Sequence, residues 1–190
     1  MSFFEYEPED IAPVEPGPEP VSPPWFGPPA GVIPTPLLAR ATIFKTDTAL
    51  FTLEHLDVYP TGIEFTLYLR LRTPLDWHGI PWEPDGRKVS ADNTEFLRLG
   101  FEFPDGSKWT NLPGQEDPFG QEPDGPFVMN RGGGGGGSRW EMKQWIWPLP
   151  TAGDLVIHSA WPALGIDETS TAIDTKLFTK AAAKAEQLPW

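Results

Sequence analysis

The sequence predicts a mainly β protein: a two-layer, antiparallel, immunoglobulin-like β-sandwich with one C-terminal helix behind an extended proline-rich arm. Three observations predict it. From residue 37 onward, apolar and polar residues alternate at the period of half-buried strands, and turn residues separate these segments. Only residues 174–188 show a helical pattern. Residues 1–36 contain eleven prolines, six acidic residues and no lysine or arginine.

Residues 1–36 form the predicted arm, and residues 37–190 the sandwich domain with its helix. Proline removes backbone donors and the acidic charges repel one another, so we expect the arm to be extended. Its apolar points are Phe3, Phe4, Tyr6 and the Pro23–Pro29 stretch. A polyproline stretch with aromatic residues is suited to docking on its own domain or on a partner. We expect Trp25 and Phe26 to anchor that docking, on the chain's own sandwich in the first instance.

The pattern predicts strands in seven segments. The clearest is 62–72, where Ile63, Phe65, Leu67, Leu69 and Leu71 alternate with polar residues. Short links predict hairpins at Pro60-Thr61 and at Pro104-Asp105-Gly106. The predicted strands are 37–46, 49–59, 62–72, 94–103, 107–111, 139–147 and 155–161, with a further edge strand at 169–173.

The C-terminal helix is predicted over 175–188, with Asp174 as its N-cap and Pro189 ending it. Two connections, 73–93 and 112–138, are long for a compact sandwich. Connections of this length are usually functional or irregular, so they are the first places to look for a site.

Composition excludes several function classes. The chain has 190 residues, 39% of them hydrophobic, which suffices for one core, and it has no cysteine for zinc sites, thiol catalysis or disulfides. A net charge of −13 disfavours nucleic acid and anionic membranes as partners. The N-terminal residues show no signal peptide and no stretch is long enough to span a membrane, so we expect a cytoplasmic protein.

The run Gly132–Gly137, between Arg131 and Arg139, is the most unusual local feature. Its spacing approaches two nucleotide-binding motifs, but both require a following helix, and a strand pattern follows here. Three interpretations stay open: a flexible surface loop, ordered backbone packed against aromatic faces, or an anion site made by its amides and the two arginines. We treat the run as the end of a long loop leading into the 139–147 strand.

Nine tryptophans are a high number, and exposed tryptophans bind sugars or anchor protein interfaces. Trp77 and Trp82 lie in the first long loop, and Trp145 and Trp147 share the polar face of their strand, where the arm could cover them. Asp76, His78, Glu83 and Asp85 bring carboxylates and an imidazole together in the first loop, although their spacing matches no metal motif. We predict no cofactor, no metal and no catalytic residue.

Several segments resemble a family of uncharacterised actinobacterial proteins. The residues that carry the likeness are Pro24–Pro29, Tyr59–Arg72, Arg131–Trp140, Trp147–Pro150 and Trp161–Ile166. The resemblance covers most of residues 24–190. It implies a bacterial, intracellular setting and no particular activity or ligand.

The sequence therefore favours a non-enzymatic module for protein–protein interaction or a structural role, with a protein partner or a second copy of the chain. The candidate binding residues are Trp25 and Phe26 in the arm, and Trp77, Trp82, Arg131, Arg139, Trp145 and Trp147 on loops or the surface. One alternative is a sandwich that binds a small ligand or carbohydrate through loop tryptophans. Another is an enzyme of unrecognised type centred on the 73–93 loop.

Overall fold

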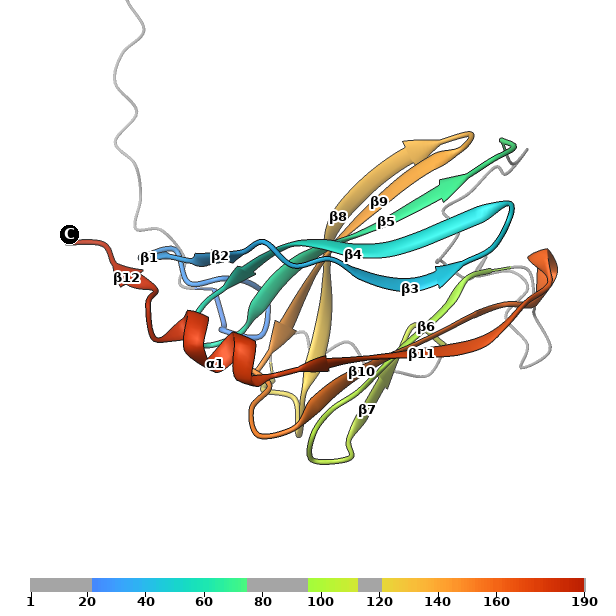
Figure 1. Ribbon diagram of the computed structural model, residues 1–190. Coiled ribbons are helices and arrows are strands. Elements are labelled where there is room, and N and C mark those ends of the chain that lie inside the picture. The colour runs from blue at the N-terminus through green and yellow to red at the C-terminus, as the bar shows by residue number, and fades with distance from the viewer. Residues whose placement is uncertain (1–21, 75–95, 113–120, 190) are drawn as a thin grey trace, which may run out of the picture.

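The computed structural model describes residues 22–74, 96–112 and 121–189. Within these ranges the chain is a mainly β, two-layer antiparallel sandwich with one α-helix, which confirms the predicted fold class (Figure 1). A six-stranded sheet forms one layer and a four-stranded sheet forms the other, and the helix lies at one end of the sandwich. No helix among the described residues is long and apolar enough to cross a membrane.

The larger sheet has the order β2–β4–β5–β9–β8, and β3 also pairs with β4 beside β2. Alternation places one face of each strand in the core, as in β5, where Phe65, Leu67 and Leu69 are buried. The hairpin between β4 and β5 forms at the predicted Pro60-Thr61 link. The strands are β2 (Thr35–Leu37), β3 (Ala41–Lys45), β4 (Ala49–Val58), β5 (Ile63–Leu71), β8 (Phe127–Gly136) and β9 (Arg139–Trp147).

The smaller sheet has the order β11–β10–β6–β7. Gly106 closes the β6–β7 hairpin with a φ of 84°, a conformation that glycine adopts without strain. A short 3₁₀ helix, Pro162–Leu164, connects β10 to β11. The strands are β6 (Arg98–Glu102), β7 (Lys108–Thr110), β10 (Asp154–Trp161) and β11 (Ile166–Asp174).

The strand order is that of an immunoglobulin sandwich. Taking β4, β5, β8 and β9 as strands A, B, D and E gives the order A–B–E–D for the larger sheet. Taking β6, β7, β10 and β11 as C, C′, F and G gives G–F–C–C′ for the smaller one. Between the layers, where a disulfide and a tryptophan pack in antibody domains, the rings of Phe65 and Phe101 lie 5.8 Å apart.

The predicted bounds of one strand and of the helix were wrong. The strand expected over 37–46 is two strands, β2 and β3, because residues 38–40 leave the sheet. The helix expected over 175–188 is α1 (Lys176–Ala182), with Thr175 and not Asp174 as its N-cap. The chain then forms β12 (Glu186–Gln187), which pairs with β1 (Val32–Ile33). This pairing outside the helix overrides the helical propensity of the last turns. The boundary expected between arm and domain, at residues 36–37, falls inside β2.

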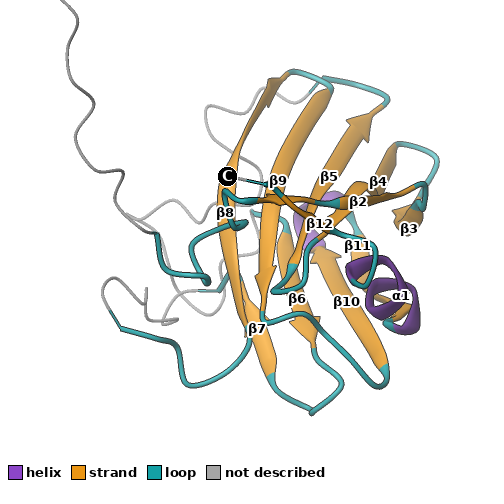
Figure 2. Ribbon diagram, turned by 90° about the vertical axis from the view of Figure 1, so that its left-hand side faces the viewer, coloured by secondary structure: helices purple, strands orange, loops and turns teal. Residues whose placement is uncertain are grey.

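The glycine run was also misassigned as the end of a loop. Gly132–Gly136 lie in β8 and pair in register with β9, from Gly132 opposite Lys143 to Gly136 opposite Arg139. Gly137 and Ser138 make the turn between the two strands. Figure 2 shows β8 as the outermost strand of its sheet.

Candidate functional site

The candidate site lies on the outer face of the larger sheet, beneath residues 23–27, which we call the N-terminal segment. Trp145 of β9 points to this outer face, opposite Glu64 of β5 and Met129 of β8. An outward tryptophan is normally exposed, yet Trp145 is 0% exposed. Gly62 makes room for its ring, because a Cβ there would lie 2.6 Å from the ring atom Cη2 of Trp145. The N-terminal segment makes the cover.

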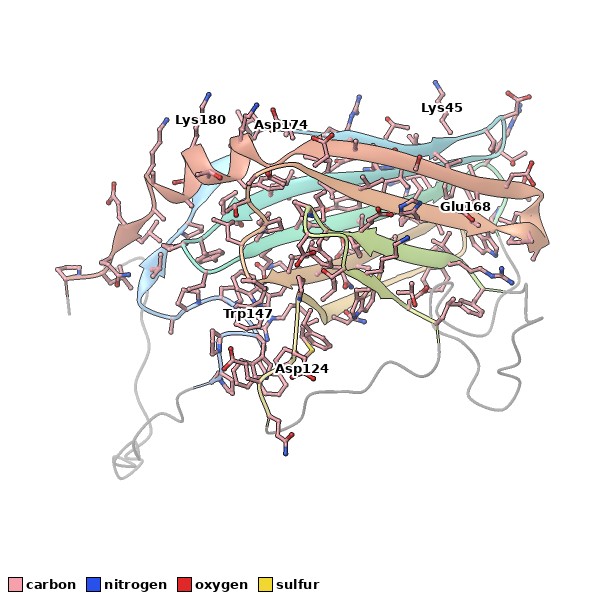
Figure 3. The ribbon with its side chains drawn as sticks, turned by 90° about the horizontal axis from the view of Figure 1, so that it is seen from below. Lys45, Asp124, Trp147, Glu168, Asp174 and Lys180 are labelled. Atoms are coloured by element: carbon pink, nitrogen blue, oxygen red, sulfur yellow. The ribbon has the colours of Figure 1, made fainter. Side chains whose placement is uncertain are left out.

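Trp145 and Trp147 contact this segment and Tyr59 packs on Trp145, and we call these three rings the aromatic platform. The indole Nε1 of Trp145 donates a hydrogen bond of 2.9 Å to the carbonyl oxygen of Pro24. The ring of Trp25 meets Trp147 edge-on at 5.8 Å, and Tyr59 meets Trp145 edge-on at 5.5 Å. Both distances are typical of stabilising aromatic pairs. Figure 3 shows Trp147 in the group of side chains beside the N-terminal segment.

Arg131 provides a second donor for the segment. Its Nη1 donates to the carbonyl oxygen of Phe26 at 3.0 Å. The register between β8 and β9 shifts between Asn130 and Gly132, so Arg131 is the extra residue of a β-bulge. A bulge changes the direction in which a side chain points, and from this bulge the Arg131 side chain extends to Phe26. Gly27 permits the contact, since a Cβ there would lie 2.9 Å from Cζ of Arg131.

Charged side chains pack beside the platform. Glu64 is 7% exposed and accepts from Nζ of Lys143 at 2.6 Å, while Nε of Arg131 lies 4.0 Å from its other oxygen. Burial and the neighbouring Glu64 carboxylate raise the pKa of Asp57. Burial, followed by the charges of Glu64 and Asp57, raises the pKa of Tyr59 from 10.0 to about 12. The cluster therefore keeps Tyr59 neutral while Lys143 and Arg131 offset the charge of Glu64.

The donors of the site suit a proline-rich main chain. A tryptophan indole and an arginine guanidinium donate hydrogen bonds and accept none. Proline lacks an N–H, so a proline-rich segment presents chiefly acceptors, its carbonyl oxygens. Trp145 and Arg131 match this pattern at Pro24 and Phe26. The arrangement therefore contacts the backbone and the rings of this segment.

The structure brings together five of the residues singled out from the sequence: Trp25, Phe26, Arg131, Trp145 and Trp147. Arg139 stands apart, exposed at the other end of β9. Trp77, Trp82, Asp76, His78, Glu83 and Asp85 lie outside the described residues. Sequence reasoning missed Tyr59, Glu64 and Lys143. The alternation placed Glu64 and Lys143 on the outer face, but the contacts of Glu64 with Arg131 and Lys143 leave no mark in the local pattern.

The described tryptophans form no exposed stripe of rings. None of the six described tryptophans is exposed: Trp140, Trp145 and Trp161 are buried, and Trp25, Trp109 and Trp147 are half-buried. An exposed stripe of rings, which the carbohydrate alternative needs, is therefore not found among them.

A depression with a volume of about 300 Å³ lies on the outer face of the smaller sheet, over Gly100. His158 lies between two carboxylates there, 3.4 Å from Glu102 and 3.7 Å from Glu168, and Lys108 lies 3.3 Å from Glu102. Positive and negative groups balance in this depression, so it points to no particular ligand. Within the described ranges, no three metal-ligating side chains gather at one point.

No family model matches the chain, and no curated protein or solved structure matches it either. The resemblance to actinobacterial proteins stays a prediction, and the function is argued from the geometry of the sites.

Proposed function

We propose that this protein is a non-enzymatic interaction module whose aromatic platform binds proline-rich segments that carry aromatic side chains. Its own residues 23–27 are the resident segment. One observation carries the proposal: the site holds this segment through two donors, Trp145 and Arg131, that contact main-chain carbonyl oxygens. Main-chain recognition of this kind serves equally for a similar segment from a protein partner or a second copy.

The cost of ordering such a segment is low. Residues 23–26 dock as a turn, in which the N–H of Phe26 donates to the carbonyl oxygen of Pro23 at 3.0 Å. Pro23 and Pro24 restrict this backbone before it binds, so less backbone entropy is lost on docking. The rings of Trp25 and Phe26 then supply buried apolar area, the usual main source of binding free energy at interfaces. A segment that competes with residues 23–27 must have the same restricted, proline-containing backbone and the same aromatic rings.

The test uses the full chain with both docking side chains replaced, Trp25→Ala with Phe26→Ala. The ligand is a labelled peptide of residues 22–31. We expect the peptide to bind this variant in a fluorescence-polarisation titration, and to bind the unaltered chain more weakly because the platform is occupied. Adding Trp145→Phe keeps a ring but removes the indole donor. Loss of one hydrogen bond should weaken binding roughly 2- to 10-fold.

The control peptide carries alanine in place of Trp25 and Phe26 and should not bind. The proposal fails if the labelled peptide does not bind the Trp25→Ala, Phe26→Ala variant, or binds it equally well when Trp145→Phe is added. The N-terminal segment would then only stabilise its own domain.

A further inference from the structure

β8 is an edge strand with an open outer side. It is ten residues long, and residues 130–136 are all exposed. Among the described residues it pairs with β9 alone. Every second residue of such a strand points its N–H and C=O away from the sheet, where another strand can pair with them.

The usual protections of an edge are missing along the glycines. Natural edges carry lysines, prolines, bulges or short strands that discourage pairing. In β8 the bulge lies at Arg131, before the glycines. The Arg131 side chain contacts Phe26 and Glu64, so it does not cover the glycine edge. From Gly132 to Gly136 the strand has no side chains, and its φ angles are positive at Gly132 and Gly135.

The glycines also leave a trough beside β9. A depression of about 510 Å³ is lined by Gly134 and Gly135 of β8 and by Arg139, Glu141, Tyr68 and Arg70 on the neighbouring strands. Arg70 is already paired with Glu54 at 3.1 Å. Arg139 is exposed and makes no ion pair within the described part of the chain. Glu141 lies opposite Gly134 and Arg139 lies opposite Gly136, so a strand added at β8 would find a carboxylate favoured at the Arg139 end of the trough.

The sequence contains one segment of that chemistry. Residues 2–7, Ser-Phe-Phe-Glu-Tyr-Glu, lie outside the described residues. They contain no proline, and in an extended chain Glu5 and Glu7 share one face while Phe4 and Tyr6 share the other. Either carboxylate can pair with Arg139 at the end of the trough where β8 turns into β9.

Chain length permits the contact within one molecule. Phe26 is fixed at Arg131 of β8 by a hydrogen bond, so the N-terminal residues depart from beside this strand. The residues between 7 and 22 can span up to about 50 Å when extended. The glycines extend only about 17 Å from Arg131 along the strand.

We propose that residues 2–7 of the same chain add to β8 as an extra strand, with Glu5 and Glu7 over the glycine trough. A second copy of β8 is a poorer occupant, because glycine facing glycine provides no cross-strand side-chain contact and two chains of charge −13 repel. The inference uses a different surface from the aromatic platform and does not depend on the function proposed for it.

Hydrogen exchange of the Gly132–Gly136 amides in the full chain tests this proposal. In the unaltered protein we expect the outward-pointing glycine amides to be protected. Phe4→Pro with Tyr6→Pro removes two donors from the added strand and should speed their exchange at least about tenfold. The matched control, Ile11→Pro with Val14→Pro, changes the same arm outside residues 2–7 and should leave the protection intact.

A second pair of variants tests the acceptor side. Gly134→Glu places an anion at the trough, where a Cβ has nothing within 4 Å, and should reduce protection at the neighbouring glycines by repelling Glu5 and Glu7. Gly125→Glu makes the same charge change at another open glycine and should not. Fast exchange in the unaltered chain overturns the proposal. So does protection that survives Phe4→Pro with Tyr6→Pro, or protection that rises with protein concentration together with a dimer in sedimentation.

Discussion

At the scale of single residues, Glu64 connects the charges of the site to its rings. Its carboxylate is buried beside Lys143 and Arg131, and Arg131 in turn contacts the carbonyl of Phe26. The same carboxylate helps to raise the pKa of Tyr59, whose ring packs on Trp145. One buried acid thus influences both a donor to the segment and a ring beneath it.

Tyr59 gives this cluster a signature in alkaline solution. With a pKa of about 12, against 10.0 in the unfolded chain, the folded state keeps the phenol proton to higher pH. Between these values the folded chain binds more protons than the unfolded chain, so the free energy of unfolding falls as pH rises through this window and then levels. Tyr59→Phe should flatten that part of the stability curve.

Absorbance titration of the phenols checks the assignment. The unaltered chain should show one tyrosine ionising near pH 12, and Tyr59→Phe should lose that step. Glu64→Gln should shift the step to lower pH but leave it above 10.0, because burial is the largest cause. An unchanged late step in Tyr59→Phe would assign it to another group.

At the scale of elements, β8 shows why glycine is required at some positions and merely present at others. A Cβ at Gly133 or Gly135 would collide with the carbonyl oxygens of Glu141 or Arg139 on β9. A Cβ at Gly134 or Gly136 would meet nothing within 4 Å. The run is therefore a strand whose close approach to β9 depends on alternate glycines.

The variants Gly133→Ala and Gly136→Ala separate the two kinds of position. We expect Gly133→Ala to lower the free energy of unfolding by about 1–3 kcal/mol, because β8 must move away from β9. Gly136→Ala should change it by no more than about 0.5–1 kcal/mol, and any change should be stabilising through lower chain entropy. Urea unfolding measures both. Equal destabilisation by the two substitutions would refute the steric argument.

Sequence reasoning succeeded where local pattern decides structure and failed where distant contacts do. Alternation predicted β4, β5, β9 and β10 nearly to their ends, because one face of each strand packs in the core. A glycine strand has no alternation to detect, so β8 was taken for a loop. The helix was extended too far because β12 pairs with β1, some 150 residues away in the chain. The docking anchors were visible as rings in a proline-rich segment, but the buried Glu64 was not.

At the scale of the whole molecule, the two layers are joined along one side by polar contacts between edge strands. Thr169 and Thr171 of β11 point inward beside Ser159 and Ile157 of β10. Their hydroxyls donate across the layers to carbonyl oxygens of β3, from Thr171 to Thr42 at 3.1 Å and from Thr169 to Ile43 at 3.3 Å. The Thr169 hydroxyl lies equally close to the carbonyl oxygen of Ser159 on β10, so it shares its proton between the two sheets. These bonds fasten the edge of the smaller sheet to the edge of the larger one and close that side of the sandwich.

Replacing both threonines with valine keeps the branched shape but removes the donors. Each hydroxyl–carbonyl bond contributes about 0.5–1.5 kcal/mol, so we expect Thr169→Val with Thr171→Val to lower the free energy of unfolding by about 1–3 kcal/mol. The slope of unfolding against denaturant should stay unchanged, since the same surface is exposed. Thr66→Val, on the outer face of β5, is the control and should have little effect. If the double variant is as stable as the control, apolar packing alone joins the layers. If it unfolds in two steps, the sheets depend on these bonds to unfold as one unit.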